Sequence, residues 1–398
     1  MKPILSSAFW VSFVIVVCLI GTALISPLYA VYASSWSLQP SQISLIYVVY
    51  MIGALLSLLC FGRLPDKLGY RPILAASLVL GFIGTVMTMS ASTLAVLMPG
   101  RFIVGLAASF ATTAGAIGLA SVTPASKRGQ LALLTNLLIA AGFGLGPLIG
   151  GLAGQWMPNP LFSAHIPTVI GSIIGLVAIT FFVPKAPASV PQEAKRLSLG
   201  DLKPSLVLPP PGRRLLFLIT CGSPFLAFGV FGLYAAMAPL FIDEILHLKG
   251  PLISGGSITV ILLISCASQI LLRKQSNMTC ALLGLSSILL SNALLFINLS
   301  SQSALLFGLG LLAAAIGHGM CMFSGMTVIN TIATAQNRAG LISTYLVIGY
   351  AGAILPTLAM GWIADVAGMD VAVMLFCLAS GGLSIALLLA NLIWAKRK

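Results

Sequence analysis

Apolar residues fall into long, nearly uninterrupted runs along the chain, and polar residues collect in the short stretches between them. A helix needs about 20 consecutive apolar residues to cross a bilayer, and most of these runs reach that length. The pattern predicts an all-α membrane protein with twelve transmembrane helices. The expected spans are residues 9–33, 42–61, 73–91, 94–120, 131–154, 165–184, 215–242, 252–272, 278–298, 304–331, 341–363 and 371–394.

The connections between runs predict how the spans are grouped. Only a few residues join the third run to the fourth and the ninth to the tenth, so each pair is expected to form a helical hairpin. The one long connection is rich in proline and basic residues, a composition typical of a linker without its own core. The predicted domains are therefore a first six-helix bundle at 1–184, a cytoplasmic linker at 185–214 and a second six-helix bundle at 215–398.

The two predicted bundles read as repeats of one another. Pro27 closes the first run as Pro239 closes the seventh, and Pro147 lies late in the fifth run as Pro356 does in the eleventh, with offsets of about 210 residues. A duplication of six spans in equal orientation is the parallel repeat of one large class of transporters, in which two bundles rock around a central site.

Composition and charge support a membrane protein and indicate its orientation. The chain of 398 residues is 59% hydrophobic and only 7% charged, which excludes a soluble domain. The net charge of +13 does not require a nucleic-acid partner, because membrane proteins retain Lys and Arg in cytoplasmic loops. With a cytoplasmic N-terminus, Lys249 is the only loop or tail cation outside and Arg101 the only cation within a span. We expect a bacterial inner-membrane protein, monomeric, with both termini cytoplasmic and the first run retained rather than cleaved as a signal peptide.

The loop between the second and third runs carries a regular pattern of Gly62, Asp66, Gly69 and Arg71. The glycines permit a tight turn, and the acid lies among cations near helix ends, where it can cap or pair. This loop resembles the signature G-x-x-x-D-x-x-G-x-R/K of the major facilitator superfamily. The resemblance implies that these residues stabilise one conformation at the interface of the two halves and do not bind solute.

Two further patterns resemble elements of the same superfamily. Arg101 and Gly105 match its R-x-x-x-G element of helix 4, and a charge within a span is expected to face a cavity or a partner. The fifth run resembles the antiporter motif of proton-coupled exporters in the drug:proton antiporter branch. Its small residues at this spacing also let helix backbones approach closely. The matching positions are Gly142, Gly146, Pro147, Gly150 and Gly151.

Carboxylates are missing from the middle of every predicted span. Many drug exporters of this superfamily carry an acid in helix 1, so its absence argues against organic cations as the solute. One titratable residue, His318, lies near the centre of the tenth run between two glycines, where it could exchange protons or bond neighbouring helices. Together with Arg101 it predicts a neutral or positive site. The remaining candidates for solute or proton contact are Ser26, Tyr29, Ser109, Thr113, Tyr234 and Asn330.

These features predict a secondary transporter that exports a small amphipathic solute, neutral or anionic, by proton-coupled alternating access. An uptake symporter or facilitator for a metabolite or sugar is the alternative, and a membrane solute sensor is more remote. An enzyme would need clustered catalytic groups, but the three histidines at 165, 247 and 318 are dispersed, and the seven cysteines have no metal-ligand spacing. We expect neither a metal nor an organic cofactor, with a proton gradient as the driving force.

Overall fold

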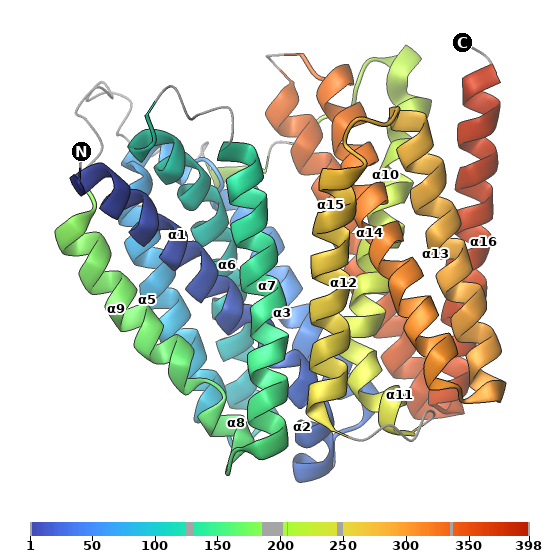
Figure 1. Cartoon of the computed structure of the whole chain (residues 1–398), viewed down its shortest axis with the longest axis horizontal. Coiled ribbons are helices and arrows are strands. Elements are labelled where there is room, and N and C mark those ends of the chain that lie inside the picture. Colours follow the sequence, from blue (N-terminus) through green and yellow to red (C-terminus); the bar gives the residue numbers. More distant parts are fainter. Residues whose placement is uncertain are drawn as a thin grey trace. The chain divides into compact units, whose positions relative to one another are not determined.

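The computed structural model describes residues 2–124, 131–184, 202–204, 206–244, 250–334 and 337–396 (Figure 1). Within these residues, 12 helical segments are long and apolar enough to cross a membrane, which confirms the predicted number and order of spans. The segments are Ser7–Trp36, Pro40–Phe61, Tyr70–Met89, Leu94–Val122, Leu134–Trp156, Pro160–Phe182, Pro211–Ile242, Pro251–Leu271, Asn277–Ser301, Ala304–Ile332, Gly340–Ala367 and Met369–Lys396.

Several spans are built from more than one helical element. The first half contains α1 (Lys2–Ala23), the 3₁₀ turn η1 (Ser26–Leu28), α2 (Tyr29–Trp36), α3 (Pro40–Phe61), α4 (Leu64–Leu68), α5 (Tyr70–Met89), α6 (Leu94–Val122), α7 (Leu131–Trp156), α8 (Pro160–Ser163) and α9 (Ile166–Phe182). The second half contains α10 (Pro211–Gly232), the π-helical segment η5 (Leu233–Met237), α11 (Ala238–Glu244), α12 (Pro251–Leu271), α13 (Asn277–Ser301), α14 (Ala304–Ile332), α15 (Arg338–Ala367) and α16 (Met369–Lys396).

Contacts divide the chain into two compact units. One unit comprises Met1–Leu28 and Val49–Pro204, and the other comprises Tyr29–Val48 and Ser205–Lys398. The segment Tyr29–Val48 belongs by sequence to the first two spans but packs with the second unit. The predicted linker at 185–214 lies outside the described residues at 185–201 and 205, and α10 already begins at Pro211.

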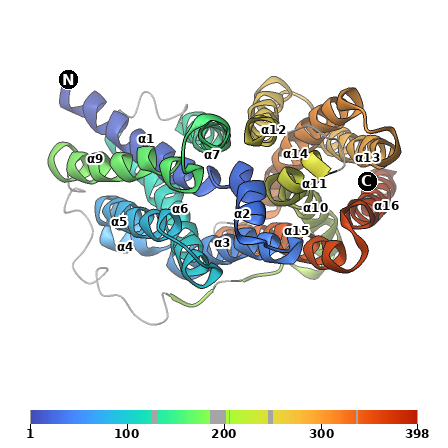
Figure 2. The same cartoon turned by 90° about the horizontal axis from the view of Figure 1, so that it is seen from below.

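In the first unit, α1 contacts α6, α7 and α9, while α5 packs against α6 and α9 (Figure 2). Glycines let these helices touch backbone to backbone. A Cβ added at Gly84 of α5 would lie 2.8 Å from the carbonyl oxygen of Gly100 on α6, so the two helices of this hairpin are too close for a side chain at this position. Small residues have this role in membranes because helices there gain little from hydrophobic burial and associate by packing.

The second unit repeats this construction with different helices. Its α10 contacts α14, α15 and α16, and α13 packs against α14 as the second predicted hairpin. A Cβ added at Gly284 of α13 would lie 2.8 Å from the Cys321 amide of α14. A Cβ at Gly352 of α15 would collide with the Phe225 carbonyl of α10, so these two helices also meet at their backbones.

The glycine face of α7 provides a direct test of close packing. Replacing Gly150 with Ala would drive the new methyl group into the Leu24 carbonyl of the first span. We expect a destabilisation of about 1–3 kcal/mol, typical of overpacking. The control is Gly382→Ala in α16, where no atom lies within 4 Å of the added carbon. A lower thermal midpoint in detergent is expected for Gly150→Ala alone; equal midpoints for both variants would contradict the close contact.

Candidate functional site

Arg101 lies inside the first unit and not at its lipid-facing surface. Its side chain is only 1% exposed, one guanidinium nitrogen donates to the Thr22 carbonyl at 2.9 Å, and its charged end lies 5.3 Å from the centre of the Tyr50 ring. These partners are a carbonyl and an aromatic face, and neither carries a negative charge. The guanidinium is therefore a buried positive charge held by polarisable groups.

Gly105 explains how Arg101 reaches these partners. A Cβ at Gly105 would collide with the Tyr50 carbonyl and lie 2.8 Å from the Ala54 amide, so α6 and α3 meet at their backbones. Residues four apart share one face of a helix. The glycine thus brings the face that carries Arg101 onto α3, where Tyr50 is located. The four-residue spacing of Arg101 and Gly105 therefore has a structural reason, independent of its resemblance to the R-x-x-x-G element.

His165 is a second buried basic residue of this unit, and sequence reasoning did not select it. It directly precedes α9 and is 1% exposed. It interacts electrostatically with Arg101. The only sequence signal was a histidine at the start of a span, which by itself is also typical of a residue at the membrane surface.

The loop with Gly62, Asp66, Gly69 and Arg71 folds into the short helix α4. Gly69 has φ +85°, a conformation that side chains rarely adopt, so a glycine is required there. Asp66 lies in the first turn of α4. Arg71 donates to the carbonyls of Ile179 and Thr180 in the last turn of α9, where a cation complements the unpaired carbonyls. Arg71 thus stabilises the first unit internally.

The antiporter-like residues form a packing face against the first span. Gly142, Gly146 and Gly150 follow one another at intervals of four, and a Cβ at each would press on Leu19, Ile20 or Leu24. Pro147 lies within α7 between Gly146 and Gly150, and Gly151 is the residue after Gly150. The small residues therefore set the distance between α1 and α7. Their arrangement fits the close packing expected from the sequence, while their link to export stays a prediction.

His318 lies in the second unit with one ring nitrogen bonded and its ring half-buried. Its Nδ1 is 2.8 Å from the Ser265 hydroxyl of α12. The two flanking glycines make this contact possible. A Cβ at Gly319 would collide with Ser268 and Ser265 of α12, and one at Gly317 would lie 2.9 Å from the Ile288 amide of α13. Close approach of three helices, rather than a flexible point in α14, is the role of these glycines.

Two aromatic rings contact His318, and a third extends the surface that they form. The Phe231 ring centre lies 5.6 Å from that of the imidazole, and the Phe228 ring centre lies 6.3 Å away in an edge-on arrangement. Tyr350 of α15 lies 5.7 Å from Phe228. All four side chains are half-buried, so they share a partly accessible surface. We call His318, Ser265, Phe228, Phe231 and Tyr350 the His318 cluster.

The other predicted contact residues have diverse environments. Tyr29 and Tyr234 are fully buried in the second unit, and Tyr234 lies in the π-helical segment η5, a distortion often found near functional sites. Ser26 is 6% exposed. The hydroxyls of Ser109 and Thr113 donate to carbonyls of Ala54 and Ser109, and Asn330 accepts from Arg338. The bonds of Ser109 and Asn330 join different helices, whereas that of Thr113 lies within α6. Contact of these residues with solute stays a prediction.

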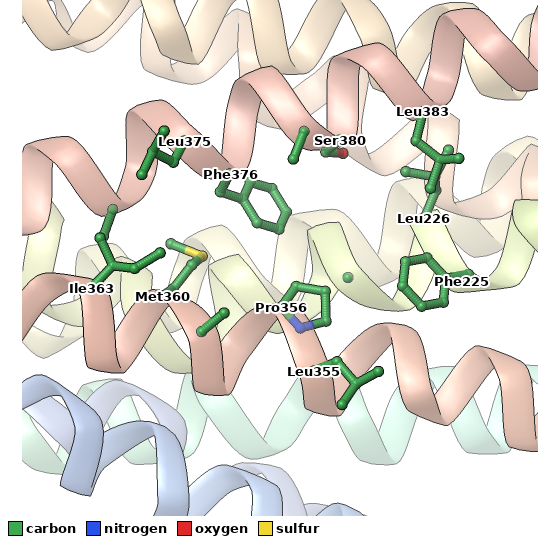
Figure 3. A pocket seen from close by; sticks show the side chains of 14 residues that line it. Phe225, Leu226, Leu355, Pro356, Met360, Ile363, Leu375, Phe376, Ser380 and Leu383 are labelled. Atoms are coloured by element: carbon green, nitrogen blue, oxygen red, sulfur yellow. The ribbon is translucent and has the colours of Figure 1, made fainter.

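An apolar groove of about 420 Å³ lies apart from the His318 cluster (Figure 3). Its walls come from α15 and α16, with Met360 and Phe376 facing one another, and its floor comes from Phe225, Leu226 and Gly229 of α10. Ser380 is the one polar residue in its lining, and its hydroxyl accepts from Asn292. Such a surface suits hydrocarbon and offers nothing to orient a polar solute.

Comparison with known proteins identifies relatives of mixed roles. Multidrug efflux protein YfmO of Bacillus subtilis (strain 168) is 28% identical over 205 residues, 50% of this chain and 48% of that protein. Riboflavin transporter RibZ of Clostridioides difficile (strain 630) is 26% identical over 157 residues, 38% of this chain and 33% of that protein. The chain thus matches half or less of the length of either relative.

Solved structures share the fold over nearly the whole chain. A bacterial homologue of the human lysosomal transporter Spinster, in an inward-facing and occupied conformation, aligns with a TM-score of 0.72. The alignment covers 98% of this chain and 96% of that one at 14% sequence identity, which supports the fold alone. The sequence model of the Major Facilitator Superfamily matches residues 11–357, so the chain belongs to this superfamily of membrane transporters.

Proposed function

We propose that this transporter exports a small amphipathic solute by proton-coupled alternating access. It would act as a monomer in a bacterial inner membrane with both termini cytoplasmic, driven by the proton gradient and without a cofactor. The observation that carries the direction is the glycine face of α7, whose residues Gly142, Gly146 and Gly150 pack on the first span as the antiporter-like sequence requires. The similarity to a multidrug efflux protein supports the same direction.

Uptake of a metabolite is the second candidate function. The described carboxylates of the chain lie at helix ends, such as Asp66 in the first turn of α4 and Asp370 in the first turn of α16. An exporter of organic cations would be expected to hold an acid within a span. The similarity to a riboflavin transporter also favours a metabolite. Both candidates use the same fold, so transport measurements distinguish them.

The His318 cluster is the surface that we propose for solute contact. When the Ser265 hydroxyl donates to Nδ1, the neutral imidazole carries its proton on Nε2, which can donate a hydrogen bond to an acceptor on the solute. The rings of Phe228 and Phe231 offer flat apolar faces for stacking. These groups suit a neutral or anionic solute with an aromatic part. Aromatic faces also attract cations, which makes an organic cation the competing solute.

The direction and the coupling are tested together in everted membrane vesicles. Untargeted analysis of solutes that accumulate inside vesicles with this protein, compared with vesicles without it, identifies the cargo. We expect accumulation to require a vesicle interior more acidic than the medium, because each proton that leaves the interior drives solute into it. Accumulation that persists after the gradient is collapsed would remove the antiport mechanism, and depletion from the vesicles would favour uptake.

Replacing His318 with Ala tests the proposed contact surface. Loss of one hydrogen-bond donor and one stacked ring is expected to weaken apparent affinity for the identified solute about tenfold. The matched control is Thr327→Ala, because the Thr327 hydroxyl donates only to Phe323 within the same helix. Equal affinity in the two variants would contradict the assignment. Transport of tetraphenylphosphonium that is undiminished when both Arg101 and His318 are replaced would contradict the preference against cations.

Asp66→Asn tests the conformational role of the loop that contains α4. Because Asp66 lies in this loop and not among the spans, solute binding should persist while transport falls strongly. Binding is measured with the solute identified above, and folding by thermal unfolding. Gly69→Ala offers a contrast, because φ +85° at Gly69 makes any side chain there strained and lowers stability. If Asp66→Asn abolished binding itself, the conformational role would be wrong.

A further inference from the structure

The end of α15 repeats the spacing of the loop that contains α4. Gly361, Asp365 and Gly368 are separated as Gly62, Asp66 and Gly69 are. Gly368 has φ +96° and ψ 158°, close to the φ +85° and ψ 157° of Gly69. The same turn therefore occurs in the loop between the last two spans. Because the number of spans before each loop differs by an odd number, the two turns lie on opposite faces of the membrane.

Asp365 is placed unfavourably with respect to its own helix. It lies two residues before Ala367, at the end of α15, where the helix dipole is negative and an acid is disfavoured. Its carboxylate has a partner elsewhere: Oδ1 accepts a hydrogen bond from the Ser41 amide at 3.0 Å. Ser41 is the second residue of α3, where backbone amides lack partners within the helix. Asp365 thus caps the positive end of another helix.

The start of α3 needs such a cap. The residue before it is Gln39, a poor capping residue, and the Gln39 amide itself donates to Gln42 Oε1 at 2.9 Å. Gly361 lets the two helix ends meet, because a Cβ there would lie 2.9 Å from the Ser41 Cα and would collide with the Ser44 hydroxyl. The first turn of α3 therefore rests on the last turns of α15.

This cap is one attachment of the segment Tyr29–Val48 to the second unit. A second attachment lies between α2 and the elements α11 and α12, and it contains a cavity. This cavity of about 220 Å³ is lined by Ala30, Val31 and Ser34 on one side and by Pro239, Ile242, Gly250, Pro251 and Ser254 on the other. The charge-assisted bond from Asp365 and the close approach at Gly361 together make the contact with α15 a specific attachment of this segment.

We propose that Asp365 is a conformational residue of the transport cycle, which stabilises one state by capping α3 and is released in the other. The inference rests on alternating access, in which the first six spans move against the last six. The segment Tyr29–Val48 belongs by sequence to the moving spans, so it must part from α15 when they move. The bond between Asp365 and Ser41 then has to break in every cycle.

Distances between spin labels at Ser35 and Val366, both exposed, test this proposal in nanodiscs without solute or gradient. The labelling background replaces Cys60 and Cys266 with Ser, because the other cysteines are buried. Asp365→Ala removes a helix cap and is expected to shift the ratio of short to long distances about fivefold toward the long state. Asp365→Asn retains an acceptor oxygen, so an intermediate shift is expected.

The matched control is Asp370→Ala, two residues after Gly368. Asp370 lies in the first turn of α16, where it complements its own helix, so this variant should leave the distances unchanged. Distances in Asp365→Ala that equal those of the unmodified chain, or equal shifts in both Ala variants, would overturn the proposal. If Asp365→Ala lowers the thermal midpoint, the distances in Asp365→Asn are used instead, and distances equal to those of the unmodified chain would overturn the proposal. Because no solute is present, this outcome is independent of the direction and cargo of transport.

Discussion

Contact between helix backbones at glycine positions is the constraint on which the rest of this structure depends. In hydrocarbon, apolar side chains gain little by leaving lipid for protein, so helices associate through close packing and through polar contacts. The pairs α5–α6, α3–α6, α1–α7, α13–α14 and α10–α15 all meet where a Cβ would collide with a neighbouring backbone. Both units are therefore held together by close backbone contacts at glycines.

The same glycines determine where polar side chains can be kept inside the protein. Gly105 brings α6 onto α3 and so places Arg101 over Tyr50, and Gly319 brings α14 onto α12 and so places His318 beside Ser265. A charged or polar group within a span is costly unless partners satisfy it, and these partners are available only because the helices are close. Packing and chemistry are therefore linked at each candidate site.

Helix ends are the second place where polar groups have a defined role. Arg71 binds the last carbonyls of α9, and Asp365 binds a first amide of α3. In both cases a charged side chain from a loop or helix end completes a helix terminus that has no partner of its own. Arg71 acts within the first unit. Asp365 instead acts on a segment that belongs by sequence to the other half of the chain, which is why it can respond to movement of the spans.

The sequence by itself determined the class of protein, the number and order of spans, both hairpins and the family, because apolar run length and motif spacing are properties of a linear pattern. It also identified Arg101, Gly105 and His318 as notable. Tertiary structure alone decided their surroundings: the burial of Arg101 and the contacts of His318 with Phe228 and Phe231. It also revealed the burial of His165. It also decided that Asp365 reaches Ser41, 324 positions away in the chain. Such pairs depend on which helix faces meet in space, and a one-dimensional pattern does not record that choice.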